Sequence, residues 1–293
     1  MNAVKELSNK MLPRLDQITI HNRGRRFAIP YLYRRGTGGP AVLFVHGLGG
    51  AKENFLAALQ SGELSDCTLL AFDNPGTGLA DFDSEACPDV SSLADVAHAV
   101  SEKLIRGPHF IAAASMGGLI ALLWLRRYSA VQVQGFINIE GNLSSEDCMF
   151  SRRTSSHDAD HFRDVVFHQI ISELLDSPHT GDRMISHNMA LNTDANAFHA
   201  YSFQTVKESD SGGLIEEFLT LNMPRLFLYG EANRSLTYLD RLRSSAVEVL
   251  EIPRSGHFLF YDNSPATFGA IGSFVHRHSA RLLIDSKEGT TCS

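Results

Sequence analysis

One serine stands at an abrupt corner in the sequence. In the stretch IAAASMGGLI (residues 111–120), an apolar run of strand length ends at Ala114 and a helical pattern begins at Met116, with no ordinary loop between them. A strand that turns into a helix so quickly strains the backbone at the corner, and such a corner can present a hydroxyl for nucleophilic attack. Ser115 is therefore a candidate nucleophile. The alternative is a structural role as a helix N-cap, because serine accepts backbone N–H bonds well at that position.

Other polar residues follow further apolar runs. Glu140 comes directly after the run in INIEGN, Glu231 and Asn233 follow RLFLYG, and His257 follows VEVLEIPRSG. A glutamate at the end of an apolar strand is costly to bury unless it is paired. We therefore expect a functional role for Glu140.

The elements that must position these residues alternate along the chain. β-rich runs of strand length lie near residues 41, 68, 109, 133, 224 and 247, and helical patterns such as SLADVAHAVSEKLI separate the first four. This order predicts an α/β fold with a mostly parallel, doubly wound sheet. In such sheets the carboxyl ends of the strands meet at one edge, where ligands bind.

The alternation stops between Asn142 and about Thr220, where the sequence is rich in helix formers and polar residues. We expect a helical cap over residues 142–220, inserted between two parts of a core domain at 1–141 and 221–293. A cap in this place would cover the ligand-binding edge of the sheet. We expect apolar groups of the cap to contact substrate, and the candidates are Phe150, Phe162, Phe167 and Met189.

The corner and its neighbours resemble the α/β-hydrolase superfamily over about residues 27–280. The pentapeptide around Ser115 resembles the nucleophile elbow G-x-S-x-G, with Ala113 in place of the first glycine. FVHGLGG resembles the HG-x oxyanion loop, and FDNPGTGLAD resembles the D-x-P-G-x-G turn. The resemblance implies an oxyanion hole formed by the backbone N–H groups of Leu48 and Met116, with Gly47 beside the substrate. IPRSGHFLFYDNSP resembles the loop that carries the catalytic histidine, which implies that His257 is the general base.

The resemblance leaves the triad acid open. Most of the family has an aspartate at the place of Asn233, and an asparagine cannot supply the negative charge that stabilises an imidazolium. Haloalkane dehalogenases and the zearalenone lactonase type carry the acid after the sixth strand instead, where Glu140 lies. We favour Glu140 over the neighbouring alternative Glu231, and Asn142 and Asn233 are then candidates for hydrogen bonding around the acid.

Three functions fit these motifs. The first is a serine hydrolase that cleaves an ester, lactone or similar acyl bond of a small, largely hydrophobic molecule through a Ser115–His257–Glu140 triad. The second is hydrolysis of a carbon–carbon bond in a ring-fission product, because those enzymes share the S-M-G-G elbow. The third is a receptor-like binding module with little turnover. A dehalogenase is disfavoured, since it needs a carboxylate where this chain has Ser115.

Composition and the amino-terminal sequence indicate which binding partners and which cellular location to expect. The 293 residues are 43% hydrophobic and 20% charged, with a net charge of −7 and no sustained Lys/Arg run, so neither nucleic acid nor a membrane is an expected partner. The expected partner is a small-molecule substrate, and a homodimer stays open. The amino-terminal MNAVKELSNKMLPRLDQ lacks the apolar core of a secretory signal, which favours a cytoplasmic protein.

The four cysteines have no CxxC spacing and are expected to be free thiols. The pair His157 and His161 is a weak candidate for a metal site, and we expect neither a metal nor a cofactor.

Overall fold

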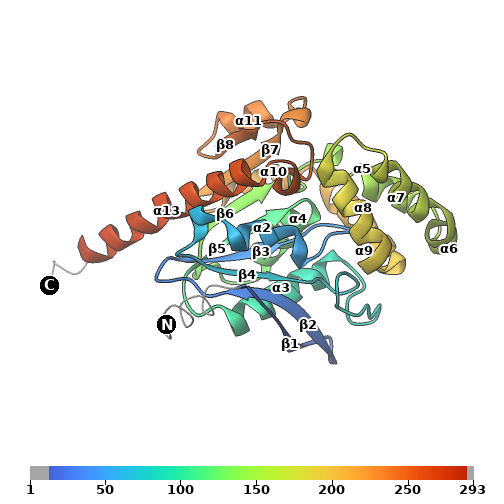
Figure 1. Ribbon diagram of the computed structural model, residues 1–293, viewed down its shortest axis with the longest axis horizontal. Helices are drawn as coiled ribbons and strands as arrows, with labels where there is room; N and C mark the ends of the chain where they lie inside the picture. The colour runs from blue at the N-terminus through green and yellow to red at the C-terminus, as the bar shows by residue number, and fades with distance from the viewer. Residues whose placement is uncertain (1–12, 289–293) are drawn as a thin grey trace, which may run out of the picture.

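The computed structural model describes residues 13–288, and its centre is an eight-stranded sheet (Figure 1). The sheet order is β1-β2-β4-β3-β5-β6-β7-β8. Strands β1 and β2 form an antiparallel hairpin that pairs antiparallel with β4, and the other neighbours are parallel. The strands are β1 (Arg14–Asn22), β2 (Arg25–Arg34), β3 (Ala41–Val45), β4 (Thr68–Phe72), β5 (His109–Ala114), β6 (Val133–Ile139), β7 (Arg225–Gly230) and β8 (Glu248–Ile252). The expected mostly parallel sheet is confirmed.

Helices cover both faces of the sheet. On one face α3 (Val90–Leu104) and α4 (Met116–Arg127) pack their apolar sides on alternate residues of the strands, with buried groups such as Val96, Leu119 and Ile120. On the other face, α2 (Leu56–Gln60) and α13 (Ser264–Glu288) bury Leu59, Phe268 and other apolar groups. Both faces of strand β5 are therefore buried, which explains why it reads as a continuous apolar run and not as an alternation.

Between β6 and β7 the chain is helical. We call this segment, residues 145–220, the insertion; its helices from α5 to α9 project to one side of the sheet in Figure 1, whereas α10 packs on the core. Its elements are η3 (Ser145–Asp147), α5 (Met149–Ser155), α6 (Ala159–His161), the π-helical turn η4 (Phe162–Val166), α7 (Phe167–Leu175), α8 (Thr180–Asn192), α9 (Ala195–Asp210) and α10 (Leu214–Thr220). Short elements elsewhere are η1 (Lys52–Phe55), η2 (Gly62–Leu64), η5 (Glu231–Asn233), α11 (Leu239–Arg243) and α12 (Leu259–Asp262).

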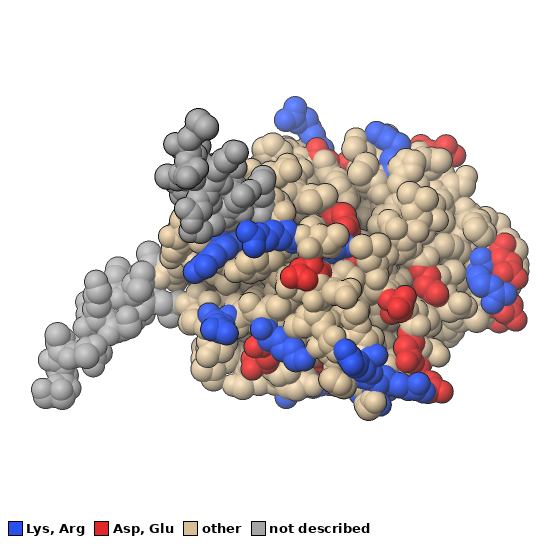
Figure 2. Space-filling view, turned by 60° about the horizontal axis from the view of Figure 1, so that its bottom comes forward, with Lys and Arg blue, Asp and Glu red and all other residues tan. Residues whose placement is uncertain are grey.

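Two further observations concern the chain as a whole. No helix within residues 13–288 is both long and apolar enough to cross a membrane. The face shown in Figure 2 carries Lys and Arg interspersed with Asp and Glu. Most of the amino-terminal stretch in which we expect no signal sequence, and Cys292, lie outside the described residues, while Cys67, Cys87 and Cys148 are buried free thiols.

Candidate active site

Ser115 occupies a strained corner between β5 and α4. Its backbone has φ 53° and ψ −130°, a conformation that costs free energy for a non-glycine residue. The surrounding packing holds it there. The Ser115 amide donates to the carbonyl of Ile139 at 3.1 Å, and a Cβ at position 117 would overlap the Val45 carbonyl oxygen and come within 2.8 Å of that of His46. A glycine at 117 is therefore required for strand β3 to lie against the first turn of α4.

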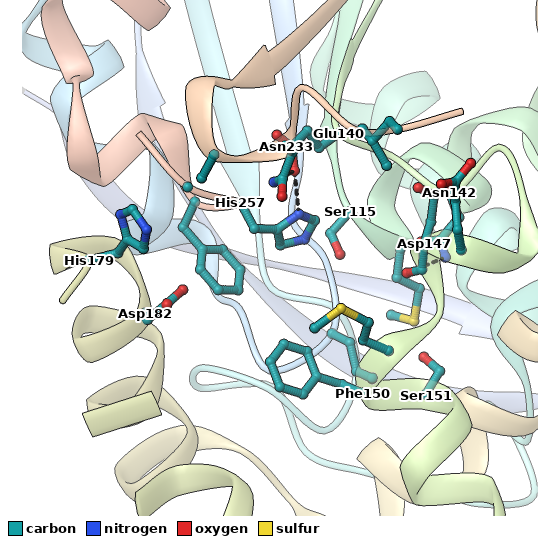
Figure 3. Close-up of a pocket in the computed structure, with 18 of the residues that line it drawn as sticks. Ser115, Glu140, Asn142, Asp147, Phe150, Ser151, His179, Asp182, Asn233 and His257 are labelled. Atoms are coloured by element: carbon teal, nitrogen blue, oxygen red, sulfur yellow. Dashed lines mark hydrogen bonds and ion pairs between the residues drawn. The ribbon is translucent and has the colours of Figure 1, made fainter. Parts of the chain in front are cut away.

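His257 lies on the loop between β8 and α12. The Asp262 carboxylate accepts a hydrogen bond from the Gly256 amide at 2.9 Å, and the Ser255 hydroxyl donates to the Ile252 carbonyl at 2.7 Å, so the two residues before His257 are fixed. His257 Nδ1 lies 2.7 Å from Glu140 Oε2. His257 and Ser115 line the same cavity, and Figure 3 shows Ser115 on the side of the ring away from Glu140.

Glu140 is a buried carboxylate with several donors. It follows β6 with a positive φ of 44°, and only 4% of the residue is exposed. Its Oε1 accepts from the Gly230 amide at 2.5 Å, and its Oε2 accepts from Asn233 Nδ2 at 2.7 Å as well as facing His257. These hydrogen bonds satisfy a carboxylate that would otherwise be costly to bury.

Glu140 governs the protonation of His257. Burial alone would lower the pKa of the imidazole, but the hydrogen bond to Glu140 and the negative charge of that residue outweigh it. Asp147 and Asp182 add to the same effect, and the pKa of His257 is raised above its ordinary value. The site therefore stabilises the imidazolium form of His257, which is the form that arises when this general base accepts a proton.

Glu231, the alternative acid, points elsewhere. Its carboxylate accepts the Arg254 amide at 2.7 Å and lies 3.6 Å from the Arg234 guanidinium. These contacts hold the Glu231 carboxylate at the protein surface. Of the two candidate glutamates, the structure brings Glu140 to His257. Asn142 lies beside the corner, where its backbone N–H donates to the Ser115 carbonyl at 3.3 Å.

Two backbone N–H groups border the corner. Met116 is the first residue of α4, so its N–H has no acceptor within the helix. Leu48 lies in the loop after β3, and both residues line the cavity with Ser115. Gly47 is not one of the described residues that line this cavity. A Cβ on Gly47 would lie 2.6 Å from Ser115 Cβ, so its absence allows the loop to approach the corner.

A buried network holds the loop that carries Leu48. His46 Nε2 accepts the Asn74 amide at 3.0 Å while Nδ1 lies 2.8 Å from the Gly47 carbonyl, so the ring is neutral with its proton on Nδ1. Lys52 Nζ lies 2.8 Å from Asp73 Oδ2, and both side chains are fully buried. These contacts give the FDNPGTG turn a structural role beside the loop that carries Leu48.

The cavity over Ser115 has a volume of about 270 Å³. The core and the insertion both contribute to its wall (Figure 3). Apolar groups in the wall are Leu48, Met116, Met149, Phe150, Leu174, Ala232, Leu236 and Phe258. Polar groups are Ser115, Glu140, Asn142, Glu146, Asp147, Ser151, His179, Asp182, Asn233 and His257. Among the described residues, no Lys or Arg belongs to this wall.

Three of the four cap residues expected at the substrate lie elsewhere. Phe150 lines the cavity, but Phe162, Phe167 and Met189 are at most 5% exposed and form the apolar core of the insertion. Phe162 stacks on Phe198 with ring centroids 5.7 Å apart. The expectation is corrected for these three residues, because the helices of the insertion need a core of their own.

Several polar residues of the wall were not expected from the sequence, including Glu146, Asp147, His179 and Asp182. Each lies in a polar stretch that resembles an ordinary helix surface, and no spacing separates the cavity face from the solvent face. His157 and His161 lie together, with ring centroids 5.1 Å apart. Within residues 13–288, however, the one group of three potential metal ligands is Asp66, Cys67 and His276, none of which lines the cavity.

Comparisons with known proteins agree with this architecture. A family model described as the alpha/beta hydrolase family matches residues 42–270. An esterase from Thermogutta terrifontis is 18% identical, with a TM-score of 0.73 over 90% of this chain and 99% of that one. An esterase from Exiguobacterium antarcticum is 16% identical, with a TM-score of 0.70 over 89% and 100%. The enol-lactonase from Burkholderia xenovorans LB400 is 16% identical, with a TM-score of 0.69 over 88% and 100%. No curated protein sequence matches the chain significantly.

Proposed function

This chain belongs to the alpha/beta hydrolase family, and on that premise we propose that it is a serine hydrolase of carboxylic esters, lactones or similar acyl compounds. The observation that carries the proposal is the Glu140–His257 contact of 2.7 Å beside a strained serine in the same cavity. Esterases and a lactonase share the fold, which supports acyl chemistry as the reaction.

The first half of the reaction forms an acyl-enzyme. Glu140 holds the proton of the neutral imidazole on Nδ1, so Nε2 of His257 accepts the hydroxyl proton of Ser115 as the oxygen attacks the substrate carbonyl. The N–H groups of Leu48 and Met116 stabilise the resulting oxyanion. When the intermediate collapses, the bond between the acyl carbon and the alkoxy oxygen breaks, and His257 gives its proton to the leaving oxygen.

The second half releases the acid. A water molecule gives a proton to His257 and attacks the acyl carbon, the ester bond to Ser115 breaks, and the proton returns to the serine oxygen. In each half, negative charge on Glu140 stabilises the imidazolium that forms. The enzyme returns to its starting state, and no cofactor is required.

The cavity favours a small substrate without negative charge. Its apolar groups can contact a hydrophobic acyl or alcohol part, and its volume suits a small molecule. The wall carries carboxyl groups from Glu146, Asp147 and Asp182, with no Lys or Arg of the described chain to oppose them. A substrate with a carboxylate of its own would be repelled, so we propose esters and lactones that carry no negative charge.

The test is a series of p-nitrophenyl esters with a serine variant. Ser115→Ala should lower kcat by about 10⁶-fold, as expected for loss of a nucleophile, and should abolish labelling by a fluorophosphonate. Ser151→Ala is the matched control, because Ser151 lines the same cavity from α5 and should keep both activity and labelling.

Several outcomes would contradict the proposal. Labelling that survives in Ser115→Ala would rule out this nucleophile. Faster turnover of a carbon–carbon substrate than of any ester would favour the second hypothesis, and tight ligand binding without turnover would favour the receptor-like one.

A further inference from the structure

Three side chains with metal-binding groups meet far from the cavity. They are Asp66 and Cys67, which directly precede β4, and His276 on α13. Strands β4 and β5 are both parallel to β3. The start of β4 and the end of β5, where Ser115 lies, are therefore at opposite ends of the parallel strands. The cluster is therefore independent of the proposed reaction.

The three potential ligand atoms lie close to the mutual spacing of a tetrahedral site. His276 Nε2 lies 2.9 Å from Asp66 Oδ1, Cys67 Sγ lies 3.6 Å from the same oxygen, and Sγ lies 3.9 Å from Nε2. With the bond lengths usual for zinc, the corresponding edges of a tetrahedron are about 3.3, 3.5 and 3.6 Å. Each pair therefore needs to move by only a few tenths of an ångström. Asp66 and His276 can do so, because both side chains are more than two-fifths exposed.

The backbone around two of the ligands is already fixed. The Asp66 carbonyl accepts the amides of Thr37 at 2.9 Å and Gly39 at 3.0 Å, from the GTGG stretch. A Cβ on Gly39 would lie 2.5 Å from Asp66 Oδ2, and one on Gly36 would overlap the backbone of Asp66 and Cys67. The glycines of this stretch therefore serve to let the loop pack against the two ligands.

The third ligand is held by helix packing. One turn before His276, a Cβ on Gly272 would lie 2.8 Å from the Glu63 carbonyl oxygen. The close approach that this glycine allows places α13 against η2, just before the two loop ligands. The guanidinium of Arg34 donates to the carbonyls of Leu64 and Cys67 and so fixes the same turn.

We propose that Asp66, Cys67 and His276 form a site for a zinc-like divalent cation, with water as the fourth ligand. A thiolate, an imidazole and a carboxylate together suit Zn²⁺ and disfavour Mg²⁺ or Ca²⁺, which prefer oxygen ligands alone. On binding, the S–H bond of Cys67 is replaced by a sulfur–metal bond and its proton passes to solvent. His276 binds through the Nε2 lone pair with its proton on Nδ1. The cation would join α13 to the start of β4 and stabilise the fold.

The experiment uses Co²⁺ as a spectroscopic probe of the full chain after treatment with a chelator. One equivalent should produce the thiolate-to-cobalt charge-transfer band and the visible bands of a tetrahedral site, and Zn²⁺ should displace it. Zn²⁺ should also raise Tm while ester turnover stays unchanged. His276→Gln should weaken binding by more than about tenfold, and this exposed position avoids the folding risk of Cys67→Ala, which should lose the charge-transfer band.

The control is another histidine of the same helix. His278 Nε2 also lies 2.9 Å from a carboxylate, Glu248 Oε1, but the three-ligand cluster does not include it. His278→Gln should bind Co²⁺ like the wild type. The proposal is overturned if wild-type protein shows no sulfur-to-cobalt band, or if His276→Gln and His278→Gln weaken binding equally. Neither result would bear on Ser115, because the ester assay is measured separately.

Discussion

Asn233 donates a hydrogen bond to Glu140, with Nδ2 2.7 Å from Oε2. Asn233 stands where most of the family has the catalytic aspartate. It therefore binds the carboxylate that takes over the role of that aspartate in our proposal. An amide in this position donates to the Glu140 carboxylate, whereas a second carboxylate would repel it. A glutamate at position 140 and an asparagine at position 233 are together consistent with a single acid beside His257.

The first prediction separates the two glutamates. Glu140→Gln should lower kcat by about 10³- to 10⁴-fold with a modest change in KM, because the amide keeps the shape but loses the charge and disturbs the imidazole tautomer. Glu231→Gln is the matched control and should stay within a few-fold of wild type, since Glu231 contacts Arg254 and Arg234. Steady-state kinetics on one ester decide the matter, and the reverse order of effects would make Glu231 the acid.

The second prediction concerns Asn233. In the wild-type background Asn233→Asp should lower kcat/KM at neutral pH, because two carboxylates at hydrogen-bonding distance cannot both stay ionised. In the Glu140→Gln background the same change restores one negative charge near His257 and should recover part of the lost activity. A double-mutant cycle measures the coupling. Additive effects of the two substitutions would show that Asn233 and Glu140 do not act on the same proton.

The third prediction is a pH profile. His257 must be neutral to accept a proton from Ser115, and its pKa is raised above the ordinary value of about 6.5. The acidic limb of kcat/KM should therefore lie above pH 6.5, with activity falling about tenfold per pH unit below it. In Glu140→Gln the burial remains while the opposing charge is gone, so the limb of the residual activity should move to lower pH.

Asp147 provides the control for this profile. Burial raises the pKa of its carboxyl to about 6, even though the amides of Leu143 and Ser144 donate to it. Asp147→Asn should keep most of the acidic limb, because Glu140 has a greater effect on His257 than Asp147 has. A wild-type limb at or below pH 6.5, or a limb that disappears in Asp147→Asn, would contradict the assignment to His257.

Local signals in the sequence predicted the sheet and the position of the corner. An apolar run that stops at a polar residue specifies a strand end, and parallel strand ends share one edge of a sheet. Ser115 and Glu140 could therefore be placed near one another from their strand ends, and His257 from the resemblance of its loop to the histidine loop of the family. The confirmed fold class rests on the same alternation. The catalytic roles of the three residues stay a proposal.

The same reasoning failed in the insertion for a physical reason. Phe150 and Phe162 give identical apolar signals, yet one lines the cavity and the other stacks on Phe198. Which side of a helix faces a cavity depends on how several helices pack together, and a single sequence does not contain that arrangement in a readable form. Polar wall residues such as His179 could not be identified from the sequence either. A helix surface that faces a polar cavity has the same composition as one that faces solvent.

The last prediction concerns the packing that holds the corner. Gly117→Ala should lower the free energy of unfolding by about 1–3 kcal/mol, since the new methyl group meets the backbone carbonyls of Val45 and His46 and neither can rotate away. It should also lower kcat, because strand β3 leads into the loop that carries Leu48, whose N–H we propose as an oxyanion donor. Gly269→Ala is the matched control: it lies inside α13 with no atom within 4 Å of its Cβ, and should be neutral or stabilising by up to about 1 kcal/mol. Urea unfolding and ester kinetics on both variants provide the test. If Gly117→Ala were as stable and active as Gly269→Ala, close contact between β3 and α4 would not be what keeps Ser115 in its strained conformation.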